Sequence, residues 1–262
     1  MLRTQVGSVA IAALIDTSFA FPVHNVYPNV SDASQRFASL LTDQGALPMI
    51  CACFLLRAAG RTILVDTGYA EAGQAQLLSE IAAAGSQPDE IDTVVFTHLH
   101  PDHTAWNIDR NTGRPTFARA RYLVPQADWD HFRAQGSDNF QCDLAPLATA
   151  GQLDYFDGEY SLSPFLTTVP TPGHTPGHTS LVVSSGGAHG FILGDVLLSP
   201  LDVLDATLEN GFDVDGAQAR ITRQTVLTRL EKSGELVASS HLAPGLGRIA
   251  TTDDGCAWQP LS

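Results

Sequence analysis

Basic residues are scarce in this chain of 262 residues, which carries 14 Lys and Arg against 28 Asp and Glu and has a formal net charge of −14. An acidic surface repels the phosphate backbone of nucleic acids. The same repulsion opposes binding to an anionic membrane surface. The charge balance therefore argues against nucleic acid and against a membrane as partners.

Long apolar runs are also absent. No segment approaches the ~18–20 consecutive apolar residues that a membrane-spanning helix needs. The apolar stretch 9–15 resembles the core of a signal peptide only faintly, because it is short and runs into Asp16 before any cleavage site. We expect a first β-strand there instead, in a soluble cytoplasmic protein whose apolar content of 44% supports a large core.

Cysteine is rare as well. Four cysteines in 262 residues are too few and too scattered for a disulfide scaffold. Cys51 and Cys53 lie two residues apart in an apolar run, so both point to the same face of a predicted strand. Thiols in that setting are predicted to pack as buried apolar core residues rather than to act as metal ligands or a redox pair.

The order of apolar runs predicts one α/β domain over residues 1–262, with two stacked sheets and helices outside. Strands are expected at residues 6–15, 50–57, 61–65, 91–97, 121–124, 152–156, 165–169, 179–184, 190–193 and, as the last strand, 235–239. Helices are expected at residues 71–84, 126–134, 140 to about 151, and 216–232. Residues 22–48 contain three prolines and are expected to form a lid or a long surface loop.

A cluster of polar residues directly follows the apolar run 94–96. Within six residues it holds three histidines and one aspartate, namely His98, His100, Asp102 and His103. Side chains two apart in an extended segment point to the same side, so His98 and His100 can bind one ion together. Pro101 ends the strand and turns the chain, which directs Asp102 and His103 elsewhere but close enough for a second ion. This spacing predicts a metal site.

Three further positions place a polar side chain in a tight loop or at the end of an apolar strand. His174 lies in a loop rich in glycine and proline, Asp195 follows the apolar run 191–193, and His241 follows the segment 236–240. Loops at the carboxyl ends of strands are where α/β proteins place their chemistry. These side chains are therefore expected to fold back onto the histidine cluster.

In residue type and order, these motifs resemble the metallo-β-lactamase superfamily. The resemblance runs from Asp66 in the segment Leu-Val-Asp-Thr-Gly to His241 and residues 247–249, so it covers nearly the whole chain. It implies an αβ/βα sandwich, in which two mixed sheets are flanked by helices and the metals lie at one edge. It also implies that Asp66 supports the ligand loop from outside the ligand set.

The resemblance implies two divalent metal ions. Their ligands would be His98, His100 and His174 for the first ion, Asp102, His103 and His241 for the second, and Asp195 as the bridge. Nitrogen and carboxylate ligands suit zinc first, with manganese, iron or cobalt also compatible. Two such ions ~3.5–4 Å apart turn a bridging water into a hydroxide nucleophile at neutral pH, and water or Asp102 then protonates the leaving group.

The remaining histidines have no such context. His178 is the second histidine of a His-Thr-Pro-Gly-His repeat and is expected to bond backbone groups rather than a metal. His24, His131 and His189 are expected at the surface, although His24 lies in the segment 22–48 and could line a pocket.

The downstream motifs resemble the lactonase and methyl-parathion-hydrolase-like branch, which includes quorum-quenching enzymes. This resemblance implies a small-molecule substrate, either a lactone or an activated ester or phosphotriester. Known acyl homoserine lactonases carry a substrate-binding tyrosine three residues after the bridging aspartate, where this chain has Leu198. Leu198 therefore indicates a more apolar pocket. Three aromatic residues either wall that pocket or pack in the core, namely Trp129, Phe132 and Phe140.

Other functions stay open. An organophosphate or aryl ester hydrolase fits the same motifs, and so does a thioesterase of the glyoxalase II type, although only Arg248 follows His241 where a basic cluster is expected. A β-lactamase proper is disfavoured, because Asp102, His103 and Asp195 belong to the hydrolase pattern. A catalytically silent binding protein would normally show a broken ligand set, and all seven positions are filled here. The family resemblance is also compatible with a homodimer.

Overall fold

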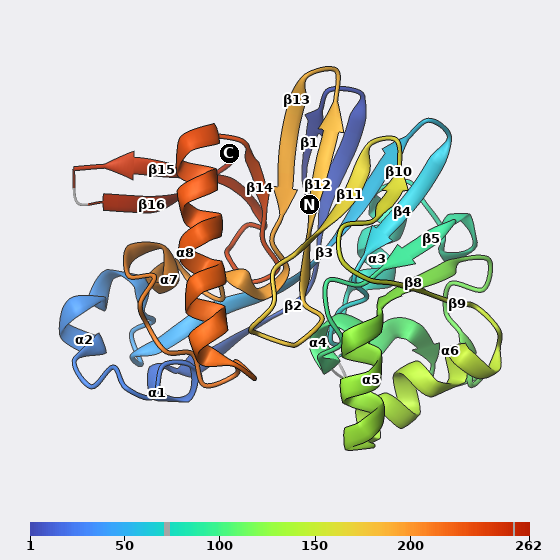
Figure 1. Ribbon diagram of the computed structural model, residues 1–262, viewed down its shortest axis with the longest axis horizontal. Coiled ribbons are helices and arrows are strands. Elements are labelled where there is room, and N and C mark those ends of the chain that lie inside the picture. Colours follow the sequence, from blue (N-terminus) through green and yellow to red (C-terminus); the bar gives the residue numbers. More distant parts are fainter. Residues whose placement is uncertain (71–73, 254) are drawn as a thin grey trace.

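The computed structural model describes residues 1–70, 74–253 and 255–262, and two seven-stranded sheets form its centre (Figure 1). The first sheet has the order β1 (Leu2–Val6), β2 (Val9–Pro22), β3 (Ala46–Ala58), β4 (Arg61–Val65), β5 (Thr93–Val95), β8 (Arg121–Pro125) and β9 (Leu153–Phe156). The second has the order β10 (Ser161–Ser163), β11 (Leu166–Pro170), β12 (Thr179–Ser185), β13 (Ala188–Ile192), β14 (Leu236–Ala238), β15 (Leu246–Thr252) and β16 (Gly255–Pro260). A separate ribbon pairs β6 (Ile108–Asp109) with β7 (Arg114–Pro115).

The helices lie outside the two sheets. They are α1 (Val23–Val26), α2 (Ala33–Arg36), α3 (Leu77–Ala83), α4 (Pro101–Thr104), α5 (Gln126–Gln135), α6 (Ala145–Thr149), α7 (Pro200–Leu204) and α8 (Gly216–Ser233). Short 3₁₀ turns are η1 (Ala38–Leu40), η2 (Pro88–Glu90), η3 (Ala105–Asn107) and η5 (Gly194–Val196), and η4 (Phe140–Leu144) is a π-turn. Figure 1 shows α8 on one side of the molecule and α5 and α6 on the other. No helix within the described ranges is long and apolar enough to cross a membrane.

Alternating side chains give each sheet one face toward the other sheet and one toward helices. Along β2, for example, Ile11 and Ala13 belong to the core between the sheets, whereas Ala12 and Leu14 belong to the core under the helices. Both sheets are mixed: β4, β5, β8 and β9 run parallel to one another, as do β13 and β14, and the other pairings are antiparallel. The predicted α/β class, with two mixed sheets flanked by helices, is confirmed.

The largest departures from the predicted elements occur at the two ends of the chain. The strand expected at residues 6–15 is a hairpin of β1 and β2, which turns at Gly7 with φ +56, and β2 continues to Pro22. The expectation that 235–239 is the last strand was wrong, because β15 and β16 follow it. These two strands are partly exposed and carry mixed polar and apolar residues, so they give no apolar run.

Two expected segments also changed. The helix expected at residues 71–84 is described from Leu77 to Ala83, and residues 71–73 lie outside the described ranges. Residues 22–48, expected to form a lid or a surface loop, contain α1, α2 and η1. Tyr27 anchors this segment, since it is fully buried and its hydroxyl lies 2.8 Å from Asp202 Oδ2 on α7. The expectation that this segment is a lid or a surface loop stays a prediction.

Candidate metal centre

The polar loops meet at one edge of the sandwich because they follow strands whose carboxyl ends point the same way. The histidine cluster follows β5, Asp195 lies in η5 after β13, and His241 follows β14. The His241 loop also joins the two sheets, since Ala52 N on β3 donates to Ser240 O at 2.9 Å. The fold therefore brings together side chains that are more than 140 positions apart in the chain.

One group of converging side chains consists of His98, His100 and His174. Nδ1 of His100 lies 3.0 Å from Nε2 of His98 and 2.9 Å from Nε2 of His174. Burial, together with the neighbouring His103, lowers the pKa of His98, and burial together with His174 lowers the pKa of His100 to about 4. The neutral rings of His98 and His100 present nitrogen lone pairs, which is the form that binds a cation, whereas hydrogen bonds to Asp195 and Asp213 outweigh burial and raise the pKa of His174 to about 9.

The second group consists of Asp102, His103, Asp195 and His241. Oδ1 of Asp195 lies 3.2 Å from Nε2 of His103, and Oδ2 of Asp195 lies 3.0 Å from Nε2 of His241. Oδ2 is also 3.3 Å from Nε2 of His174, in the first group. The Asp195 carboxylate therefore lies between the two groups and touches both.

Buried atoms without partners indicate what this centre is built to hold. Nε2 of His103 and Oδ1 of Asp195 are buried, and although they lie 3.2 Å apart they form no hydrogen bond with each other or with another described residue. Leaving such atoms unsatisfied costs about 1–3 kcal/mol each, so their presence in a native site needs a reason. A cation between nitrogen and carboxylate donors supplies one, and the donor set therefore fits divalent metal ions.

A cavity of about 420 Å³ opens beside the two groups. Its metal-side lining consists of His100, Pro101, Asp102, His174, Asp195 and His241. The opposite wall is largely apolar and consists of Phe19, Phe21, Met49, Tyr69, Leu198 and Phe212. An apolar cavity with a few convergent polar groups at one end is typical of a small-molecule site.

Comparison with known proteins agrees with this geometry. A sequence model described as the metallo-beta-lactamase superfamily matches residues 46–241, about three quarters of the chain. The chain belongs to the metallo-beta-lactamase superfamily. An N-acyl homoserine lactonase from Bacillus sp is 28% identical over 244 residues, which cover 83% of this chain and 88% of the relative. The N-acyl homoserine lactonase AttM of Rhizobium radiobacter is 28% identical over 176 residues, which cover 63% of each chain.

Solved structures of superfamily members share the fold over almost the full length. AidC, described as a dizinc quorum-quenching lactonase, superposes with a TM-score of 0.87 at 22% identity and covers 100% of this chain and 97% of its own. AbOPH, described as a hydrolase in the beta lactamase superfamily, gives a TM-score of 0.86 at 24% identity and covers 99% and 97%. At 22–24% sequence identity, this structural similarity establishes that the chain shares the fold of these proteins.

Among the pocket residues named from the sequence, Leu198 lies in the wall of this superfamily member's cavity. The suggestion that Trp129, Phe132 and Phe140 wall the pocket is corrected, because all three are buried in the core under α5 and α6 and do not line the cavity. Phe132 comes nearest, with its ring 5.5 Å from that of His100. Their helical spacing reflects core packing, which was the other reading of the same pattern.

Asp66 belongs to neither ligand group, but it forms a hydrogen bond with His103 of the second group. Its Oδ2 lies 2.9 Å from Nδ1 of His103, and its two oxygens accept 2.8 Å hydrogen bonds from the backbone and hydroxyl groups of Thr97. Such contacts fix the orientation of the imidazole ring. Asp66 has φ +60, a conformation that aspartate tolerates better than most residues do.

His178 contacts backbone groups and belongs to neither group. Its Nδ1 lies 3.0 Å from the carbonyl oxygen of Thr171, and its Nε2 accepts a 2.9 Å hydrogen bond from the Asp195 N–H. A Cβ at Gly194 would come within 2.6 Å of His178 Nε2, so the glycine permits this approach. The imidazole of His178 therefore holds the backbone of Asp195. His24 and His189 are exposed and His131 is half-buried, and all three lie outside both groups.

Two supports of the ligand loops were missed in the sequence. Asp213 lies 3.0 Å from Nδ1 of His174, and the fully buried Arg223 on α8 donates to Asp213 and to the carbonyl oxygen of Val196 in η5. Asp128 on α5 accepts hydrogen bonds from the Leu99 N–H, between His98 and His100, and from the Thr175 hydroxyl, next to His174. Neither aspartate has a motif around it, so no sequence signal distinguishes it from a surface residue.

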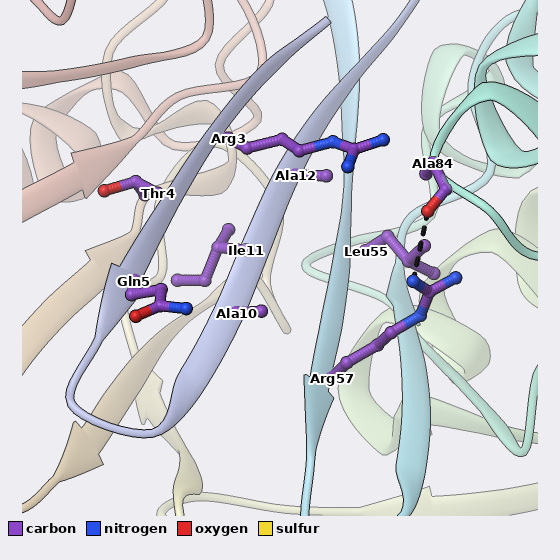
Figure 2. A pocket seen from close by; sticks show the side chains of 9 residues that line it. All are labelled: Arg3, Thr4, Gln5, Ala10, Ile11, Ala12, Leu55, Arg57 and Ala84. Atoms are coloured by element: carbon purple, nitrogen blue, oxygen red, sulfur yellow. Dashed lines mark hydrogen bonds between the residues drawn. The ribbon is translucent and has the colours of Figure 1, made fainter.

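A larger cavity of about 540 Å³ lies beside β1, β2 and the end of α3, away from the ligand loops (Figure 2). Figure 2 shows Arg3 and Arg57 extending toward Ala84. Arg3 donates to the carbonyl oxygen of Ala83 at 2.7 Å, and Arg57 donates to that of Ala84 at 3.0 Å. These bonds satisfy the last carbonyl groups of a helix, so the two guanidinium groups have a structural role.

Proposed function

We propose that this protein is a metal-dependent hydrolase that opens the ring of a lactone. The observation that carries the proposal is that one buried carboxylate, Asp195, contacts both groups of convergent ligands beside an apolar cavity. The curated relatives are named N-acyl homoserine lactonases, which supports a lactone over other esters. The homodimer, the single domain and the cytoplasmic location implied by the sequence stay predictions.

Two divalent cations, zinc first, are the proposed cofactors. The ligands would be His98, His100 and His174 for one ion and Asp102, His103 and His241 for the other, with Asp195 shared. When bound, such a pair supplies a hydroxide nucleophile near neutral pH and polarises the attacked carbonyl group. The convergence of six nitrogen and carboxylate side chains on one shared carboxylate supports two ions rather than one.

The residues of the chain would divide the remaining work. Asp102 is the most exposed carboxylate of the centre, with 24% of its side chain accessible, and it lines the cavity. It is therefore placed to hold a proton for the alkoxide oxygen that leaves the ring. The apolar wall excludes water from the reacting ester and gives an acyl chain a surface to bury.

The proposal is tested with the metal-loaded protein on N-hexanoyl-homoserine lactone, an aryl phosphotriester and a thioester. We expect kcat/KM for the lactone to exceed that for the phosphotriester by more than ~100-fold, which is about 2.7 kcal/mol of differential transition-state binding. Removing the metal with a chelator should abolish turnover, and adding zinc should restore it. A preference for the phosphotriester or the thioester would refute the lactonase assignment, and binding without turnover would indicate a binding protein.

A further inference from the structure

One polar side chain in the active-site cavity has no part in the proposed metal centre. Among the described lining residues, every side chain with a titratable or hydrogen-bonding group belongs to the two ligand groups except Tyr69. The other residues of the apolar wall are phenylalanine, methionine and leucine, which cannot donate a hydrogen bond. Tyr69 therefore supplies the hydroxyl group of an otherwise apolar wall.

Aromatic contacts connect Tyr69 to the metal end of the cavity through Phe19. Its ring meets the ring of Phe19 edge-on at 6.4 Å, and the Phe19 ring lies 6.3 Å from that of His241. The Phe19 ring thus contacts both Tyr69 and one of the proposed ligands, His241. The tyrosine is 42% exposed, and its hydroxyl bonds no other residue in the described part of the chain, so a substrate can reach it.

The backbone of Tyr69 is held by a buried carboxylate. Oδ2 of Asp16 accepts hydrogen bonds from the N–H groups of Tyr69 at 2.9 Å and of Ala70 at 3.0 Å. Oδ1 of Asp16 accepts from the backbone N–H of Leu77 at 2.8 Å and from the indole N–H of Trp106 at 3.0 Å. Asp16 is fully buried, so these bonds are protected from water and fix the loop.

The same loop is bonded directly to the metal-ligand segment. The N–H of Thr67 donates to the carbonyl oxygen of His103 at 2.7 Å, and the N–H of Ala105 donates to that of Gly68 at 3.0 Å. A Cβ at Gly68 would lie 2.6 Å from Oδ2 of Asp16, so the loop approaches the carboxylate as closely as a glycine allows. The backbone of the loop that carries Tyr69 is therefore fixed relative to the reacting centre before substrate arrives.

We propose that Tyr69 determines specificity by donating a hydrogen bond to a second carbonyl oxygen of the substrate, outside the reacting ester. The site would then select lactones that carry an amide carbonyl beside the ring over plain alkyl lactones. A pocket that offers a hydrogen-bond donor discriminates against analogues that lack the acceptor, because the donor is left unpaired. The proposal rests on the lactonase function proposed above and names the class of lactone.

The test compares Tyr69→Phe with the parent protein on N-hexanoyl-homoserine lactone and on γ-decanolactone, which has a similar apolar chain but no amide. We expect the substitution to lower kcat/KM roughly tenfold for the amide-bearing lactone, as the loss of one hydrogen bond implies, and less than about threefold for γ-decanolactone. Metal content and Tm are measured for both proteins. Tyr160→Phe is the matched control, because Tyr160 is 45% exposed and does not line the cavity.

The outcomes separate the two proposals. An equal loss on both lactones, or no loss on either, overturns the role of Tyr69 while the lactonase function stands. A metal-loaded parent protein that hydrolyses neither lactone overturns the lactonase function, and the role of Tyr69 falls with it. A loss confined to the amide-bearing lactone, with unchanged metal content, supports the proposal, since a structural role would lower both rates.

Discussion

Replacing Asp128 by asparagine should weaken the first metal group without touching any of its ligands. Oδ2 of Asp128 accepts hydrogen bonds from the Leu99 N–H at 3.0 Å and the Thr175 hydroxyl at 2.9 Å, and Oδ1 accepts one from the Gly177 N–H at 2.6 Å. Leu99 lies between His98 and His100, and Thr175 follows His174. One carboxylate on α5 therefore holds both loops that carry the first group.

The magnitude follows from counting these bonds. Asparagine has one oxygen and one NH₂ group in place of two oxygens, so in either orientation at least one backbone N–H of Leu99 or Gly177 faces a donor. Leaving a buried donor unsatisfied costs about 1–3 kcal/mol. Burial raises the pKa of Asp128, so removing its charge recovers part of that cost. We expect the free energy of unfolding to fall by about 1–2 kcal/mol.

The Asp128→Asn substitution should lower the affinity for metal more than it lowers the free energy of unfolding. Losing a group that orients metal ligands typically costs 10–100-fold in affinity, and here only one of two ions should be affected. The measurement is competition with a chromogenic chelator, combined with urea unfolding of the metal-free and metal-loaded proteins. Asp130→Asn is the control on the same helix, because its exposed ion pair with Arg133 is worth less than about 1 kcal/mol. Two ions bound by Asp128→Asn with parental affinity would refute the reasoning.

Three further predictions concern the centre, the core and a buried acid. Asp195→Ala should reduce the metal stoichiometry below two and lower activity by more than the roughly 100-fold typical of an outer contact, and parental activity would contradict the shared carboxylate. Trp129→Leu should cost about 1–3 kcal/mol of stability in urea and leave the ratio of lactone to phosphotriester hydrolysis unchanged, whereas a changed ratio would return Trp129 to the pocket. Burial raises the pKa of Asp143 to about 6 despite its ion pair with Arg110, so the folded protein binds a proton that the unfolded chain releases. Its stability relative to Asp143→Asn should therefore rise as the pH falls from 7 through about 6, and parallel pH profiles of urea unfolding would contradict this.

The candidate ligands could be identified from the sequence because each lies in a short, distinctive segment. His98, His100, Asp102 and His103 fall within six residues after an apolar run, and extended geometry alone brings two of the histidines to one side. The helix 216–232 was predicted almost to its observed bounds, since its apolar stripe ends at Gly234, which adopts φ +57. In these regions the relevant interactions are local, so the sequence pattern reports them.

The wall of the cavity depended on tertiary structure. Phe19 and Phe21 reach it because β2 continues to Pro22, and its final residues pair with the start of β3 rather than forming a loop. Trp129, Phe132 and Phe140 have the same chemistry but face the core, and helical spacing cannot decide which elements cover a helix face. Aromatic residues therefore mark apolar surroundings in the sequence, and only the packing of distant segments decides whether these surroundings are a core or a pocket.

The supports of the site were decided by tertiary structure for a related reason. Asp16 holds a loop 53 positions away, and Asp128 holds loops 29 and 47 positions away. An isolated aspartate in a sequence is most often a surface residue, and its hydrogen bonds to remote backbone N–H groups leave no periodic pattern. The sequence by itself determined the fold class and the candidate ligands, because each of these is marked by residue patterns within short segments. The orientation of those ligands and the shape of the cavity required the folded chain, because they arise from contacts between segments far apart in sequence.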